Sequence, residues 1–168
     1  MKKILFALLA LSACSQQPGE TAHDEHAAMA GMETAHQMDG AAATLGDLSI
    51  TSAWAASTPG GAEVAAGYLT IANAGDVDDR LIGVSSPRAG RAETHEMAMD
   101  GDMMTMRKVD AILVPAHGEA RLSPGALHLM LFDITAPFVE GESVPVTLHF
   151  ERAGEVSLDL PVKARPTH

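Results

Sequence analysis

The chain has 168 residues with 22 acidic and 11 basic side chains, which gives a formal net charge of −11 at pH 7. Such an acidic chain is a poor partner for nucleic acid, and its single cysteine excludes an internal disulfide. We therefore expect its stability to come from a packed core, for which the length is sufficient.

Residues 1–13 have the pattern of a secretion signal, with Lys2 and Lys3 followed by an apolar run too short to span a bilayer. The sequence Leu-Ser-Ala-Cys at 11–14 resembles a bacterial lipobox. We expect cleavage before Cys14 and lipidation of that residue, which anchors the protein in the membrane. An ordinary signal peptide that is cut nearby is the alternative. The expected location is the periplasm, and the outer membrane is favoured because Ser15 follows the cysteine.

Residues 14–44 are predicted to form a flexible, lipid-anchored tether. The stretch from 15 to 43 has no Lys, Arg, aromatic, Val, Ile or Leu residue, so it cannot bury enough apolar surface to fold alone. Either this segment is only a solvated acidic linker, or it is also a mobile arm that captures a second metal ion. Its candidate ligands are His23, His26, Met29, Met32, His36 and Met38.

Residues 45–163 form short apolar segments that are separated by Gly, Pro, Asn and Asp residues, a pattern typical of an all-β domain. No long amphipathic helix is evident there, so the predicted fold is an antiparallel β-sandwich, followed by a short tail at 164–168. We expect strands at 48–54, 64–72, 80–85, 92–99, 104–111, 119–122, 126–134, 143–151 and 156–162.

The predicted strand at 126–134 has two different faces. Leu127, Leu129 and Leu131 alternate onto one face, and His128 and Met130 alternate onto the other. The leucines need the core, so we expect His128 and Met130 to point away from it together. Two residues apart on one strand, their side chains start about 6–7 Å from each other and can converge on one ion.

The segments at 92–99 and 104–111 predict a hairpin, because the Asp-Gly dipeptide at 100–101 is a good turn signal. Folding at this turn should bring His95 and Met106 together across the strand pair. The same faces of the two strands also carry Met97, Met99 and Met104.

Four side chains thus form the candidate metal site: His95, Met106, His128 and Met130. Two imidazoles and two thioethers are a soft, neutral ligand set that suits one Cu(I) ion better than zinc, iron or calcium. Packing at the core or its rim is the alternative for the other methionines, including Met103. Auxiliary ligand candidates are Met97, Met99, Met104 and the six tether residues.

The spacing His–x10–Met–x21–His–x–Met resembles the periplasmic copper chaperones called PCu(A)C. The surroundings are similar too: THEM at 94–97, MRKV at 106–109 and PGALHLML at 124–131. The resemblance covers residues 45–163 and implies a cupredoxin-like β-sandwich of Greek-key type. It also implies that one Cu(I) is bound by His95, Met106, His128 and Met130.

The resemblance further implies delivery of copper to the CuA centre of cytochrome c oxidase, in subunit II, or to an oxidase assembly factor. A copper-sequestering or resistance lipoprotein, or a structural envelope lipoprotein, is the alternative. A blue-copper centre needs a Cys thiolate, which residues 45–163 lack, and no Ser–His–acid, phosphate-loop or HExxH pattern indicates an enzyme. We therefore expect a carrier protein without catalytic activity, whose partners are copper, the acceptor protein and, through its lipid, the membrane.

Overall fold

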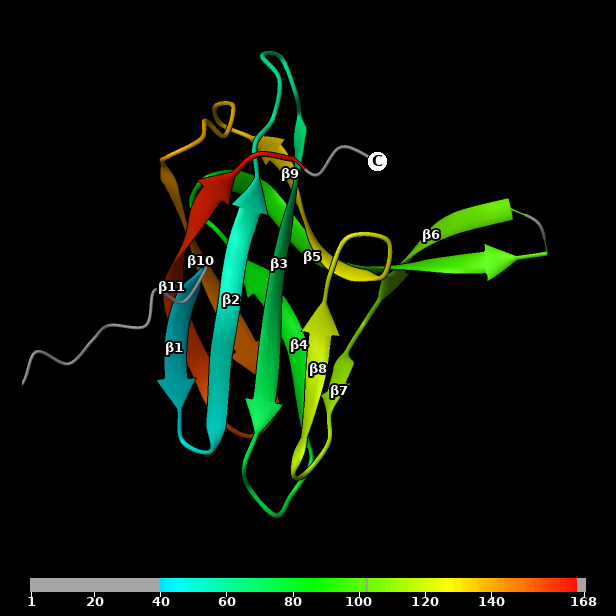
Figure 1. Ribbon diagram of the computed structural model, residues 1–168, viewed down its shortest axis with the longest axis vertical. Coiled ribbons are helices and arrows are strands. Elements are labelled where there is room, and N and C mark those ends of the chain that lie inside the picture. The colour runs from blue at the N-terminus through cyan, green and yellow to red at the C-terminus, as the bar shows by residue number, and fades with distance from the viewer. Residues whose placement is uncertain (1–39, 102, 166–168) are drawn as a thin grey trace, which may run out of the picture. The chain divides into compact units, whose positions relative to one another are not determined.

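The computed structural model describes residues 40–101 and 103–165, and every helix or strand in these ranges is a β-strand (Figure 1). In chain order the strands are β1 (Ala41–Leu45), β2 (Leu48–Ala56), β3 (Val64–Asn73), β4 (Asp79–Ser85), β5 (Ala89–Asp100), β6 (Met103–Val109), β7 (Ile112–Val114), β8 (Gly118–Leu122), β9 (Leu127–Ile134), β10 (Ser143–Phe150) and β11 (Gly154–Lys163).

The strands hydrogen-bond in the order β6-β5-β9-β3-β2-β11-β10-β4-β7, with β1 beside β2 and β8 beside β3. In Figure 1, β1, β2, β3 and β8 lie in front, and β4 and β10 run behind them. Strand β11 joins the two layers, because it pairs with β10 and its last residues run parallel to β2. The other described pairings are antiparallel, in agreement with the predicted sandwich.

One hydrophobic core lies between the layers. Burying an aliphatic or aromatic side chain of this size contributes about 1.5–3 kcal/mol. Gly67 on β3 is closely packed, because an added Cβ would lie 3.2 Å from Cδ1 of Leu160 on β11. The largest fully buried side chains are Phe138, Ile50, Leu69, Ile71, Leu81, Leu129, Leu131, Leu148 and Leu160.

All nine predicted strands are present, and two further strands were not predicted. Strand β1 includes residues 41–44, which the sequence assigned to the tether. Its alanines have little intrinsic preference for a strand, and pairing with β2 holds them there. Strand β7 follows the predicted strand at 104–111, which ends earlier than expected, at Val109; Ile112–Val114 then pairs with β4.

A bulge in β2 changes which side chains face the core. The pairing with β3 shifts between Thr51 and Trp54, and Ser52 between them has a φ of 52°. Leu48 and Ile50 are buried before the bulge, whereas Ala53 and Ala55 are buried after it. Trp54 therefore lies on the outer face, where its ring centroid is 4.7 Å from that of Tyr68 on β3.

Several predictions fall on residues 1–39 and 166–168, outside the described residues. These are the signal peptide, Cys14 and its lipid, most of the tether and the end of the C-terminal tail. The six tether ligand candidates, His23, His26, Met29, Met32, His36 and Met38, lie there too. Within the described ranges, no helix is long and apolar enough to span a membrane.

Candidate metal centre

The two faces of β9 separate core side chains from polar and sulfur-containing ones, as predicted. Leu129 and Leu131 are fully buried in the core, and Leu127 packs at its margin. His128 and Met130 lie on the opposite face. His128 is nevertheless only 5% exposed, so it is covered from above rather than open to solvent.

The hairpin β5–β6 lies beside His128, and its register brings His95 and Met106 near each other without placing them directly opposite. His95 lies opposite His128 on β9, with the ring centroids 6.1 Å apart. Across the hairpin, on β6, Lys108 lies opposite His95. Met106 lies opposite Met97, which is two residues further along β5. Met106 is therefore the diagonal neighbour of His95, still within reach of a long side chain. The two-residue turn that pairs residue 100 with Met103 sets this register.

Three of the four predicted ligands line one depression of about 310 Å³ at the foot of the hairpin. They are Met106 from β6, and His128 and Met130 from β9. His95 does not line this space but lies beside it, next to His128. The complete lining is Ala66, Tyr68, Met97, Met104, Met106, Gly125, His128 and Met130.

The hydrogen bond of His128 determines which of its ring nitrogens is free. Nδ1 lies 2.9 Å from the carbonyl oxygen of Ala126. A carbonyl can only accept, so Nδ1 carries the proton and donates it. In the neutral ring, Nε2 then keeps its lone pair. Histidines that bind metals commonly have their other nitrogen fixed in this way.

His95 has a similar arrangement with its nitrogens exchanged. Its Nε2 donates to Oε2 of Glu93 at 3.0 Å, which leaves the lone pair on Nδ1. That Nδ1 is buried and has no hydrogen-bond partner among the described residues. A buried nitrogen without a partner is costly, and a bound ion would satisfy it. The sequence analysis did not identify Glu93, although its position two residues before His95 on one strand places both on the same face.

Glu93 is held by three basic side chains. In addition to His95, it contacts Lys108 Nζ at 3.3 Å and Arg91 Nη1 at 3.0 Å. The hydrogen bond from His95 is the main cause that lowers the pKa of Glu93 to about 2. The hydrogen bond from Lys108 and the charge of Arg91 act in the same direction, against the effect of desolvation. Glu93 is therefore ionised at neutral pH and can orient the ring of His95.

The donor atoms around these two rings are mainly sulfur. Within residues 40–101 and 103–165, no three His, Cys, Asp or Glu side chains are arranged to hold a metal ion. This part of the chain therefore offers no site of the oxygen-rich kind that calcium prefers, nor a structural zinc site of Cys and His. What the depression offers is imidazole nitrogen together with thioether sulfur.

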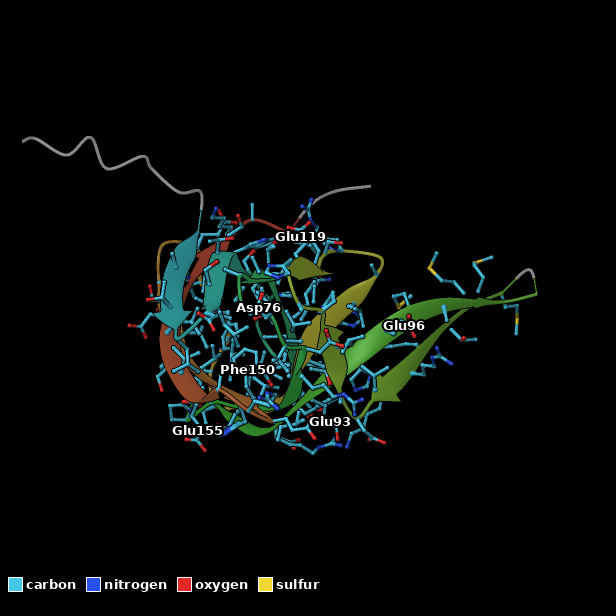
Figure 2. All side chains as sticks on the ribbon, turned by 90° about the horizontal axis from the view of Figure 1, so that it is seen from below. Asp76, Glu93, Glu96, Glu119, Phe150 and Glu155 are labelled. Atoms are coloured by element: carbon cyan, nitrogen blue, oxygen red, sulfur yellow. The ribbon has the colours of Figure 1, made fainter. Side chains whose placement is uncertain are left out.

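The remaining methionines of the hairpin are not core residues. Met99, Met103 and Met104 are between 63% and 69% exposed, so packing in the core is excluded for them. Met97 is half-buried and lines the depression with Met104. In Figure 2 the hairpin extends beyond the sandwich, and sulfur atoms are visible along it.

Two further histidines lie at the surface of the sandwich and pair with polar side chains. Nε2 of His117 contacts Asp76 at 2.8 Å. His149 contacts Glu155 at 2.9 Å and Ser85 at 3.0 Å. Both residues have ordinary polar partners, and we assign them no ligand role.

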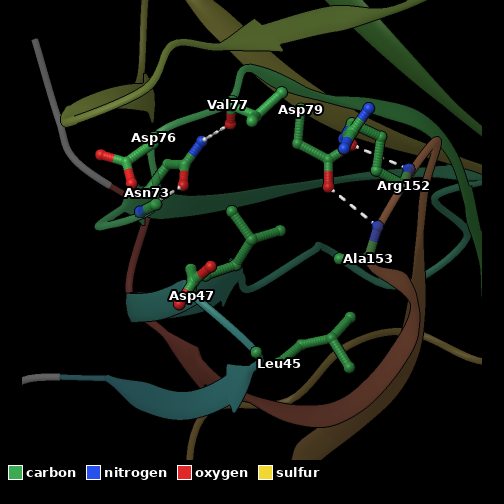
Figure 3. Close-up of a pocket in the computed structure, with 11 residues that line it drawn as sticks. Leu45, Asp47, Asn73, Asp76, Val77, Asp79, Arg152 and Ala153 are labelled. Carbon is green, nitrogen blue, oxygen red and sulfur yellow. Dashed lines mark hydrogen bonds between the residues drawn. The ribbon is translucent and has the colours of Figure 1, made fainter.

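A second depression, between β1, β4 and the turn after β10, is rich in carboxylates (Figure 3). Asp79 accepts hydrogen bonds from the backbone N–H groups of Arg152 and Ala153 at 3.0 and 2.9 Å. The side-chain amide of Asn73 donates to the carbonyl of Val77 at 2.9 Å. These polar groups hold turns in place, and the depression contains no soft donor.

Comparison with known proteins gives a consistent result. Residues 48–162 match the family described as "Putative lipoprotein LpqE-like". A curated relative, "Putative lipoprotein Lxx21020" from Leifsonia xyli subsp. xyli, is 27% identical over 115 residues, which are 68% of each chain.

Solved structures with the same fold include the copper-bound PCuAC domain from PmoF2. It is 31% identical, with a TM-score of 0.66 over 74% of this chain and 99% of that domain. The Cu(I) form of DR1885 from Deinococcus radiodurans is 27% identical, with a TM-score of 0.56 over 67% of this chain and 76% of the other. The shared fold is a cupredoxin-like β-sandwich.

Proposed function

The chain belongs to the LpqE-like family and has a domain of the PCuAC type, and from this premise we propose that it carries Cu(I) in the bacterial cell envelope. In this proposal copper is the cargo, and the protein catalyses no reaction. The observation that carries the proposal is the pair of histidines, each with one ring nitrogen held by an acceptor and the other free, beside a depression lined by methionine sulfur.

The proposed ligands are Nδ1 of His95, Nε2 of His128 and the sulfur atoms of Met106 and Met130. His95 and His128 are direct neighbours across β5 and β9. Met130 is two residues from His128 on the same face, and Met106 reaches the same depression from β6. One ion bound between this depression and the neighbouring His95 would give the unpartnered Nδ1 of His95 the contact that it lacks.

The chemistry of this set favours Cu(I) over Cu(II). Thioether sulfur is a soft ligand, whereas Cu(II) prefers a tetragonal arrangement of nitrogen and oxygen. The four ligands are neutral, so the monovalent ion keeps its own charge in the site. Thioethers also form no disulfides, which suits them to an oxidising compartment better than thiols.

Transfer by ligand exchange fits the uneven exposure of the site. His128 is buried, whereas Met106 is 49% exposed and lies on the edge strand β6. An acceptor could replace Met106 first and His128 last, so that copper is never released to water.

We propose that the acceptor is the CuA centre of cytochrome c oxidase or an assembly factor for it, and that lipid on Cys14 keeps the carrier at the membrane. The tether would then present copper, including a second ion, to the domain.

Competition titration with a chromophoric Cu(I) chelator, without oxygen, tests this proposal. The full-length protein would be compared with its Met106→Ala and Met130→Ala variants. Each variant should bind the tightest copper ion at least about 10-fold more weakly, because even the loss of an outer-shell partner of a metal site costs that much. Met103→Ala is the matched control, since Met103 is also exposed on β6 but pairs with residue 100 and does not line the depression. Unchanged affinity in both ligand variants would reject the assignment.

A further inference from the structure

The outer half of the hairpin carries a second pair of methionines beyond the proposed copper site. Met99 on β5 lies directly opposite Met104 on β6, one step further out than the pair of Met97 and Met106. Residues on one face of a strand alternate, so these two pairs continue the face that carries His95. The hairpin that bears them projects from the sandwich (Figure 2).

No other strand of the described chain covers this outer pair. The pairing of β5 with β9 ends at Glu96 and Leu127, and the N–H of Met97 still donates to the carbonyl of Ala126. From residue 98 outward the hairpin is a two-stranded ribbon. Met99 is 64% exposed and Met104 is 63% exposed. Exposed apolar side chains gain nothing from the hydrophobic effect, and packing therefore does not explain methionine at these positions.

The geometry of a directly opposite pair suits binding of one ion by two thioethers. Side chains across antiparallel strands start about 4.5–5.5 Å apart at Cβ, and methionine has three rotatable bonds with which to bring its sulfur to a common point. Met104 also lines the depression that contains His128 and Met130. The outer pair therefore lies next to the proposed site rather than apart from it.

We propose that Met99 and Met104 form a second, weaker site for Cu(I) or Ag(I) at the outer end of the ribbon. The proposal rests on the proposed function, because it takes the inner site as the destination of the ion. The outer site lacks imidazole and has only two thioether ligands, so it fills after the inner one. An ion passes between them when one metal–sulfur bond forms as another breaks, with no change in oxidation state.

Nuclear magnetic resonance of the full chain, with the methionine methyl groups labelled, tests this inference. The probe is Ag(I), a monovalent stand-in for Cu(I) that needs no reductant. We expect the first equivalent to shift the methyl signals of Met106 and Met130. The second equivalent should shift those of Met99 and Met104 and leave that of Met103 in place.

A Met99→Leu, Met104→Leu double variant keeps the apolar volume and removes both sulfurs. This variant should lose the ion bound at the ribbon, so that it takes up less Ag(I) when two equivalents are added. The control variant Met103→Leu should take up as much Ag(I) as the unsubstituted protein. The inference is overturned if the second equivalent shifts only Met29, Met32 and Met38 of the tether, or shifts Met103 equally. Failure of the proposed function looks different, because the first equivalent would then leave Met106 and Met130 unmoved.

Discussion

The body of the sandwich and the ribbon at the end of β5–β6 use apolar side chains in opposite ways. In the body, leucines such as Leu129 and Leu131 are fully buried, and their methyl groups have no chemistry except packing. In the ribbon, Met99 and Met104 are mostly exposed, and their sulfur atoms can bind soft metals. Methionine in the ribbon thus leaves its sulfur accessible to a ligand, whereas the apolar side chains of the body stabilise the fold.

The junction of the two regions is where the proposed site lies. On β9 the body contributes His128 and Met130 from the face opposite the leucines, and the ribbon contributes Met106. Substitutions in the body should therefore change stability, and those at the junction should change copper affinity. Substitution of Met103, on the face of the ribbon opposite Met104 and Met106, should change neither.

The largest effect is expected in the body. Leu129→Ala leaves a cavity in the core and should lower the free energy of unfolding by about 2–5 kcal/mol. Urea denaturation of the full chain without copper measures it. A loss below about 1 kcal/mol would mean that the core around β9 is less tightly packed than the structure shows.

At the junction, His128→Ala should weaken Cu(I) binding by at least about 100-fold, since outer-shell partners alone account for 10- to 100-fold. The control is His149→Ala, which removes a surface histidine that contacts Glu155 and Ser85. Chelator competition gives both affinities. Equal losses in the two variants would mean that the effect does not come from this site.

Glu93→Gln should weaken Cu(I) binding by about 10- to 100-fold, because the amide orients His95 less firmly than the carboxylate does. Glu96→Gln is the matched control. Glu96 lies on the opposite face of the same strand and contacts Arg107 at 2.6 Å. If the two variants bind equally well, the carboxylate of Glu93 has no part in holding the ring.

The low pKa of Glu93 predicts a difference in acid stability. Its pKa falls from an ordinary 4.5 to about 2 in the folded protein, so its contribution to stability is present above pH 4.5 and is lost as the pH falls through about 2. The urea midpoint of the unsubstituted protein should therefore fall more steeply in this window than that of Glu93→Gln. The other carboxylates are common to both proteins, so they cancel in the difference between the two urea midpoints. If the two midpoints fall in parallel as the pH is lowered, the low pKa assigned to Glu93 is wrong.

The smallest effect is expected at Met103, on the face of the ribbon opposite the proposed ligands. Met103→Gln should change the free energy of unfolding by less than about 0.5 kcal/mol, as surface substitutions usually do. The residue is 69% exposed and pairs only with residue 100 at the turn. A loss above about 1 kcal/mol in urea denaturation would show that the ribbon packs on something, and the contrast with the body would fail.

The sequence predicted the features that depend on local alternation. The leucines of β9 identified the core face, and the Asp-Gly turn identified the hairpin. It did not predict β1, which forms only because β2 offers an edge, or the bulge at Ser52, which changes the core face of β2.

In the site, alternation placed His128 beside Met130 but could not set the register between strands. The register makes Met97, and not His95, the direct partner of Met106, and leaves His95 and Met106 as diagonal neighbours. Tyr68 and Ala66 line the depression from β3, and their contribution depends on which strand lies next to β9. Neither the sequence spacing nor the residue types carry that information.

The central claim, that two thioethers and two imidazoles at the foot of the ribbon hold one Cu(I), is tested most directly by X-ray absorption at the copper edge. The samples are the full chain with one equivalent of Cu(I) and its Met106→Leu, Met130→Leu variant. Our account predicts two sulfur and two nitrogen neighbours in the unsubstituted protein and loss of both sulfurs in the variant. Copper with only nitrogen and oxygen neighbours, or a sulfur signal that the variant leaves unchanged, would contradict it.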